Sequence, residues 1–186
     1  SRSGERALLA MGVTRRHRGP ASGQAALVEL SSGKVLRSFP VEHVRCRRAA
    51  FSPDERSILT ASETEVAIWD AARGEKRAAI SGTKRNFAGY VNAGHYVLTA
   101  DDRVVELRDA TTLALLRSFE PSSLRETAAT DDTTIGDAIV FPDESRLASV
   151  SWNGMLSVWD FNTGDLLLTE RAHNGGVHRV EIVPDG

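Results

Sequence analysis

The residue types that carry catalysis and metal binding are few in this chain. The candidates are five histidines and one cysteine: His17, His43, His95, His173, His178 and Cys46. No two histidines have the spacing of a zinc-binding helix motif, and one cysteine cannot complete a cysteine-rich metal site. There is no glycine-rich phosphate loop leading into a helix, and no G-x-S-x-G nucleophile elbow. The sequence therefore predicts no catalytic residue, no metal site and no cofactor.

Several arginines offer a different chemistry, suited to binding. Arg16 and Arg18 belong to a basic stretch, and Arg47 and Arg48 are adjacent. Arginine clusters recognise carboxylate and phosphate groups through their planar side chains with several donors. A nucleic-acid-binding chain would carry more positive charge and more stacking aromatics than the net charge of −2 and 6% aromatic content found here. Proteins, and not nucleic acids, are the predicted partners.

Composition is that of an ordinary globular protein. Of the 186 residues, 41% are hydrophobic and 26% are charged, which supplies enough apolar side chains for a core. No run of about 18 apolar residues exists, so no membrane contact is expected. The apolar stretch near the N-terminus is too short for a signal peptide. A single cysteine excludes an internal disulfide and favours a reducing, cytoplasmic setting, with Cys46 as a small buried hydrophobic residue.

The charge is unevenly distributed along the chain. Residues 1–50 hold ten Lys/Arg and three Asp/Glu, a net charge of +7, whereas residues 51–186 have a net charge of −9. Such a polarised surface can steer the approach of charged partners. The simpler explanation, that neighbouring repeats merely differ in surface charge, is favoured.

A repeat of about forty residues organises the chain. An acidic residue in the turn after the third strand of each unit recurs at 29, 70, 109 and 160, so the periods are 41, 39 and 51 residues. Four-stranded propeller blades repeat every 40–45 residues or so. The third period is longer because residues 120–134 form an insertion rich in Ser, Thr and Asp. Composition does not distinguish a binding loop from a tolerated extension in this insertion.

A second sequence marker, a Pro-Asp turn, recurs along the chain together with the acidic residue. A Pro-Asp turn closes an apolar strand at 53–54, at 142–143 and at 184–185. Short apolar segments separated by turn residues fill each unit, and no sustained helical period occurs. Pairing the strands as a β-sandwich would leave the repeat unexplained, so the predicted fold is an all-β propeller.

These residues resemble the WD-repeat family of β-propellers. Trp-Asp pairs stand at 69–70 and 159–160, and residues 172–186, AHNGGVHRVEIVPDG, are similar to the opening pattern of the family repeat. The resemblance implies that His173 lies in a buried hydrogen-bonded chain with Ser/Thr, Asp and Trp. The sequence departs from this network, since the family aspartate survives only at Asp102, in the unit that lacks its Trp. Degenerate blades held mainly by apolar packing are therefore expected.

The repeat divides the chain into about four four-stranded blades. The expected boundaries are 1–40 for blade one, 41–82 for blade two, 83–120 for blade three, the insertion at 120–134, 135–171 for blade four, and an opening strand of a fifth blade at 172–186. The family usually closes a ring with seven blades, so an incomplete ring is expected. Open blade faces predict self-association, with the pairing of two copies into an eight-bladed ring as one form.

The predicted function is that of a non-catalytic scaffold that binds protein partners through loops on one face of the propeller. The predicted contact residues are Trp152, Arg16, Arg18, Arg47, Arg48 and Arg179. Family geometry places the arginines on one loop or at the rim of the central channel. Trp152 precedes a turn, where an aromatic side chain is either a binding anchor or folded onto the next blade's loop.

Two other functions remain open at this stage. The Arg- and Ala-rich composition and degenerate blades also fit a sensor or regulatory region of a larger bacterial-type signalling protein, such as a kinase or signalling ATPase. A propeller enzyme with an active site at the channel would instead bring acidic and histidine side chains within hydrogen-bond reach of one another.

Overall fold

The computed structural model describes residues 4–11, 23–41, 46–82, 87–101, 103–120 and 133–183. These residues form antiparallel sheets joined by turns, with one short 3-10 helix, η1, at Asn92–Gly94. No helix in the described part of the chain is long and apolar enough to cross a membrane.

Four sheets follow one another along the chain, and within each sheet every strand pairs with the next strand in sequence. The first sheet contains β1 (Arg6–Met11), β2 (Gly23–Glu29) and β3 (Val35–Val41). The second contains β4 (Cys46–Phe51), β5 (Ser57–Ser62), β6 (Glu65–Asp70) and β7 (Lys76–Ser81). The third contains β8 (Phe87–Val91), β9 (Tyr96–Ala100), β10 (Val105–Asp109) and β11 (Leu115–Phe119). The fourth contains β12 (Ile135–Val140), β13 (Arg146–Ser151), β14 (Met155–Asp160) and β15 (Leu166–Arg171).

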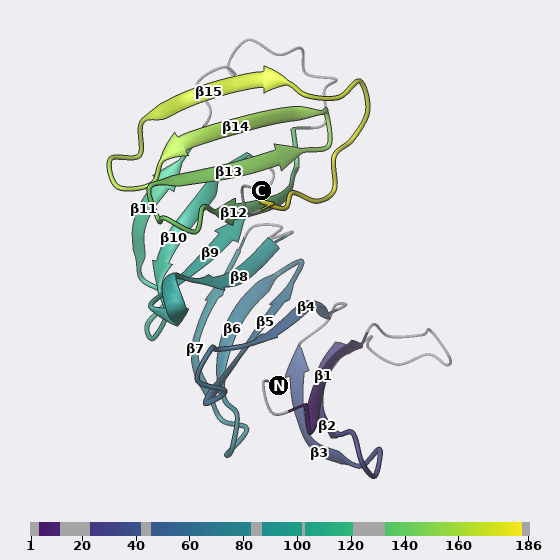
Figure 1. The fold of residues 1–186 in the computed structure, drawn as a ribbon. Coiled ribbons are helices and arrows are strands. Elements are labelled where there is room, and N and C mark those ends of the chain that lie inside the picture. The colour runs from purple at the N-terminus through teal and green to yellow at the C-terminus, as the bar shows by residue number, and fades with distance from the viewer. Residues whose placement is uncertain are drawn as a thin grey trace.

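The sheets are arranged as successive blades of a propeller that does not close into a ring (Figure 1). The first strands of the second, third and fourth blades, β4, β8 and β12, contact one another along the inner side. The later strands of each blade lie progressively farther out (Figure 1). The predicted fold class, an all-β incomplete propeller, is confirmed.

A β-bulge at the same place in every blade shows that the repeat is structural. The pairing of the third strand with the outer strand shifts register at Leu27/Val28, Ile68/Trp69, Leu107/Arg108 and Val158/Trp159. Each shift lies immediately before one of the four acidic residues that the sequence analysis aligned, at 29, 70, 109 and 160. Trp69 and Trp159 occupy this position in the blades that carry tryptophan, and both are buried.

The recurring aspartate closes the turn into the outer strand. In blade two, Asp70 Oδ1 accepts hydrogen bonds from Ala72 N at 2.9 Å and Arg73 N at 2.7 Å. Asp109 and Asp160 accept the same two backbone bonds in blades three and four. In the first blade Glu29 stands at this position and instead accepts a bond from Ser32 Oγ. Local turn chemistry therefore explains why the acidic residue recurs.

The core lies between blades and consists of three apolar clusters, one at each junction. At the first junction Phe39 of β3 meets Trp69 edge-on, with ring centroids 5.9 Å apart and an interplanar angle of 63°. At the third junction Phe119 of β11 meets Trp159 with the same separation and angle. Edge-to-face aromatic pairs of this kind add to the stabilisation from buried area. The blades are thus held by packing, as the degenerate repeat predicted.

The first and third junctions also share a polar contact. Arg37 Nη1 donates to Arg73 O at 3.1 Å across the first junction, and Arg117 Nη1 donates to Phe161 O at 2.5 Å across the third. Arg37 and Arg117 each belong to an identical tetrapeptide, Leu-Arg-Ser-Phe, at 36–39 and 116–119. The first and third junctions are therefore built alike, whereas the second lacks both the arginine bridge and the Phe–Trp pair.

Parts of the family's hydrogen-bonded chain persist. Trp69 Nε1 donates to Thr60 Oγ1 at 2.8 Å, but Trp159 Nε1 is buried with no partner among the described residues. The prediction that His173 is buried in such a chain is wrong, because its side chain is exposed and accepts a bond from Gly175 N at 3.0 Å. Cys46 is buried as predicted.

The predicted opening strand of a fifth blade does not form a strand between 177 and 183. In the other blades an inner strand pairs with the strand that follows it. No such strand lies beside residues 177–183 in the described chain, so these residues pack against the fourth blade instead. Val177 N donates to Ser151 O at 3.2 Å, and Val180 N donates to Asp137 Oδ2 at 3.3 Å.

Replacing Phe39 with Leu tests the packing between blades. The substitution removes the edge-to-face contact with Trp69 and part of a fully buried side chain, and should lower the free energy of unfolding by about 1–2 kcal/mol. Urea denaturation followed by far-UV circular dichroism measures this loss. Leu36→Ala is the control, since Leu36 lies in the same strand but is exposed. A midpoint for Phe39→Leu that equals the wild-type value would contradict the role of this contact.

Acid should weaken the fold through the turn aspartates. Hydrogen bonds from backbone N–H groups, chiefly of Arg73, Thr112 and Thr163, hold the pKa values of Asp70, Asp109 and Asp160 below their usual range. A carboxylate whose pKa is depressed by folding contributes stability above its unfolded pKa and loses it as the pH falls through the folded value. Urea midpoints should therefore be constant above about pH 5 and fall below about pH 4. A midpoint that did not change down to pH 3 or so would exclude this contribution.

Candidate protein-binding site

Trp152 lies at the turn between β13 and β14, where the residue is 43% exposed. Its backbone N–H donates to Thr134 O at 2.9 Å, which fixes the start of the turn. The indole meets the His178 ring edge-on, with centroids 5.0 Å apart and an interplanar angle of 70°. Both alternatives for Trp152 are therefore realised in part: one side of the ring contacts the segment after the fourth blade, and the rest faces solvent.

The segment after β15 is held closely against this turn. Ala172 N donates to Gly154 O at 2.9 Å. Gly154 has a φ of +84°, and a Cβ at this position would lie 1.9 Å from His173 O. Glycine is required there because the backbone is left-handed and the neighbouring carbonyl is too close for any side chain.

A ring of side chains lines the inner surface of the blades. Arg48, Phe87 and Asp137 occupy one register position on the inner strands β4, β8 and β12. Their partners on the second strands are Ala61, Ala100 and Val150, respectively. The Arg48 guanidinium lies 4.4 Å from the centroid of the Phe87 ring, and Arg48 Nη1 lies 3.5 Å from Asp137 Oδ1. Asp137 is buried, so the arginine compensates a carboxylate that is largely removed from water.

This ring borders an open cavity of about 570 Å³. Arg179, Val180 and Glu181 of the C-terminal segment line the cavity together with the inner strands. Arg179 Nη2 forms an exposed ion pair with Glu181 Oε1 at 2.7 Å. Arg47 points to the turn of its own blade, where Nη2 lies 2.6 Å from Glu63 Oε1.

Comparison with known proteins gives consistent results. The family model described as WD domain, G-beta repeat matches residues 123–160. A serine-threonine kinase receptor-associated protein from Gallus gallus is 27% identical over 141 residues, which are 75% of this chain and 37% of that protein. The Mus musculus protein of the same name is 25% identical over the same coverage. The β-propeller domain of Cps50 (Swd1) from Myceliophteria thermophila superposes with a TM-score of 0.70 at 17% identity, over 87% of this chain and 54% of that domain.

Residues 123–160 match a WD repeat, and the blades have the fold of a β-propeller. The chain spans well under half the length of the curated relatives that it matches. The fold rests on the structural neighbour and on the four blades, because the family model itself covers a single repeat.

The blades and the C-terminal segment bring together some of the predicted contact residues and separate others. Arg48 and Arg179 border the same cavity. Trp152 contacts His178, the residue before Arg179. Arg47 is directed away into its pair with Glu63. Arg16 and Arg18 lie outside the described residues, as does most of the 120–134 insertion.

Sequence reasoning missed Phe87 and Asp137, which complete the inner ring. A signal was present, because Arg48, Asp137 and Arg179 each stand five residues before the proline of a Pro-Asp turn. Phe87 stands five residues before Asn92, which replaces that proline in the third blade. Counting back from these turns would have assigned all four residues to one layer.

The described histidines do not converge on a shared site. His95 follows the 3-10 helix between β8 and β9, whereas His173 and His178 belong to the C-terminal segment. In the described part of the chain no group of three or more His, Cys, Asp or Glu side chains could hold a metal ion. The charged side chains of the inner ring are instead engaged with each other, through Arg48 and Asp137.

Fluorescence quenching tests the exposure of Trp152. Trp69 and Trp159 are 3% and 1% exposed, so acrylamide should reach the Trp152 indole far more readily than the other two. Trp152→Phe should therefore remove most of the quenchable emission, whereas Trp69→Phe should leave it in place. Equal Stern–Volmer slopes for the wild-type chain and the Trp152→Phe variant would show that Trp152 is covered in solution.

Proposed function

We propose that the chain is a non-catalytic platform that binds protein partners at the face carrying Trp152 and at the adjoining channel rim. The observation that supports this most directly is the exposure of the Trp152 indole beside His178 and the arginine-lined cavity. Exposed tryptophan and arginine are the side chains most enriched among residues that dominate binding energy. Trp152, Arg48 and Arg179 are the proposed principal contacts, with Arg47 at the edge.

The rigidity of the surrounding structure favours this role. Trp152 is fixed by its backbone bond to Thr134 and by the ring of His178, so little side-chain entropy is lost when a partner covers it. Arg48 is held over Phe87 and beside Asp137. A partner that contacts Arg48 therefore meets a preorganised guanidinium, which can offer its remaining donors to a carboxylate or a backbone carbonyl.

The relatives indicate the kind of process in which such a platform would act. The matching proteins from Gallus gallus and Mus musculus are named as associated with a serine-threonine kinase receptor. An association of this type, with proteins of a signalling pathway, is the proposed role of the present chain. The name of the relatives supports a binding function without chemistry of its own.

Alanine substitution of Trp152 tests the proposal. Partners captured by the immobilised chain and identified by mass spectrometry would be purified and titrated against wild type, Trp152→Ala and the double variant Arg48→Glu/Arg179→Glu. Loss of a central tryptophan anchor should weaken binding by about 30-fold or more. Leu167→Ala, a change at another exposed apolar residue on the outer strand β15, should leave the affinity unchanged. A partner bound equally well by all variants would rule out this site.

A further inference from the structure

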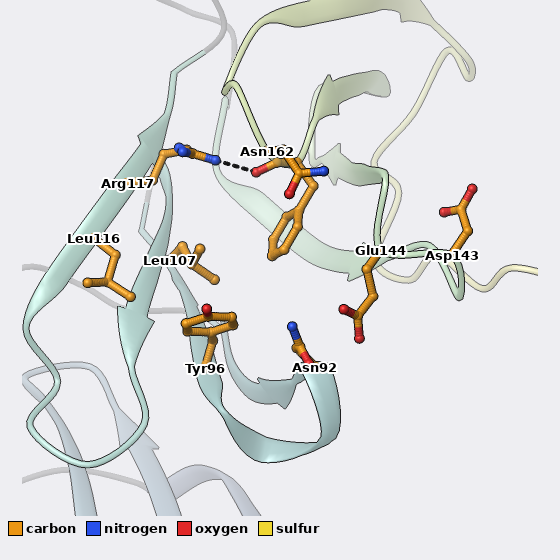
Figure 2. A pocket seen from close by; sticks show the side chains of 9 residues that line it. Asn92, Tyr96, Leu107, Leu116, Arg117, Asp143, Glu144 and Asn162 are labelled. Carbon is orange, nitrogen blue, oxygen red and sulfur yellow. Dashed lines mark hydrogen bonds between the residues drawn. The ribbon is translucent and has the colours of Figure 1, made fainter.

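A second pocket lies between blades three and four, on the face opposite Trp152. Its volume is about 460 Å³. Tyr96, Leu107 and Phe161 supply apolar and aromatic walls. Arg117 lines the blade-three side, and Asp143 and Glu144 stand on the blade-four side (Figure 2). Figure 2 shows the Glu144 carboxylate directed into the hollow between the two blades. Trp152 is at the other end of the same sheet, because one strand, β13, separates the two turns.

The turn that carries Glu144 has a counterpart in blade two. The tripeptide Pro-Asp-Glu occurs at 53–55 and at 142–144. Both glutamates have left-handed backbone angles, with φ of 58° at Glu55 and 55° at Glu144. Both donate their N–H to a carbonyl three residues back, at 2.8 Å and 2.9 Å. Glu55 and Glu144 are therefore equivalent residues at the first and third junctions, the two junctions that are built alike.

The equivalent residues differ in what they face. Across the first junction, Arg6 Nη2 of β1 donates to Glu55 Oε2 at 2.8 Å. In blade three, the position of Arg6 is occupied by Tyr96, since each stands opposite the acidic turn residue of its blade, Glu29 or Asp109. No cation takes the place of Arg6 at the third junction among the described residues. Glu144 thus shares its pocket with Tyr96 where its counterpart pairs with a guanidinium, and the one arginine of the pocket lining, Arg117, is bonded to Phe161 O.

We propose that this pocket binds the guanidinium of an arginine side chain contributed by a partner polypeptide. The arginine would pair with Glu144 as Arg6 pairs with Glu55, and its planar group would stack on the ring of Tyr96 or Phe161. The side-chain amides of Asn92 and Asn162 line the same pocket and offer carbonyl oxygens to the remaining donors.

Charge favours such a partner. Residues 51–186 carry a net charge of −9, so a basic segment is attracted to this part of the molecule. Arginine fits better than lysine, because its five donors in a flat fork match a carboxylate beside aromatic rings, whereas a compact ammonium is more strongly hydrated. The inference goes beyond the proposed function, since it concerns the opposite face and a defined chemical group.

Small probes that differ only in charge test the assignment directly. N-acetyl-arginine N-methylamide would be titrated into the isotope-labelled chain while the methyl signals of Leu107 and the side-chain amide signals of Asn92 and Asn162 are followed by NMR. Saturable shifts are expected with this probe and not with the citrulline analogue, which has nearly the same shape but no charge. The absence of saturable shifts with the arginine probe would overturn the proposal.

Variants of two side chains locate the binding. Glu144→Gln removes one charge and should lower the affinity for the arginine probe about tenfold or more. This is the loss expected for a charge-assisted hydrogen bond. Glu170→Gln removes the same charge from an exposed position on β15 and should have no effect. Tyr96→Arg should abolish probe binding, because it recreates within the chain the arrangement of Arg6 and Glu55.

Each remaining outcome counts for or against the proposal. If Glu144→Gln and Glu170→Gln lowered the affinity for the arginine probe equally, the probe would be attracted by net charge alone. This result would overturn the proposed site. A lysine probe that binds as tightly as the arginine probe would overturn the assignment to a guanidinium. Trp152→Ala should leave probe binding unchanged, so failure of the platform at the Trp152 face and failure of this pocket are distinguishable.

Discussion

Apolar packing between adjacent sheets is the interaction on which the rest of this structure depends. Each blade buries little within itself, and all three core clusters lie between neighbours. The blade is therefore a building unit whose stability comes from the next one. The turns at the two ends of each sheet therefore contribute little to the packing between blades. The turn at Trp152 and the turn at Glu144 can vary in sequence while the packing between sheets holds them in place.

The junctions come in two kinds, and this alternation gives the structure a longer period than the single blade. The first and third junctions share the Phe–Trp contact, the arginine bridge and the Pro-Asp-Glu turn. The second shares none of them: Ala78 stands where Arg37 and Arg117 stand in β3 and β11. The structural unit is thus a pair of blades. A difference between matching junctions, such as Tyr96 in place of Arg6, is informative because the surroundings are otherwise the same.

The sequence was sufficient to predict the fold because the residues that recur in each repeat are turn residues, whose hydrogen bonds are local. Asp70 and Asp160 satisfy their own turns, so their recurrence marks each blade whatever its neighbours are. Contacts across junctions were not predictable in the same way. The Arg48–Asp137 pair joins residues 89 apart and depends on which blades face each other. The error at His173 has the same origin, since the surroundings of this side chain depend on how the C-terminal segment packs and not on the chemistry of a local turn.

The proposed site around Trp152 and the pocket at Glu144 differ in how their charges are compensated. This difference bears on what each site can bind. On the inner side, Arg48 and Asp137 neutralise one another, so a partner there gains less from charge than from covering the Trp152 indole. At the junction of blades three and four, Tyr96 takes the place of the arginine that pairs with the counterpart of Glu144, and Arg117 in the same pocket is bonded to Phe161 O. Binding at Trp152 would be governed by apolar area, and binding at Glu144 by a cationic group. A single partner that used both would need an apolar anchor and an arginine separated by the length of strand β13.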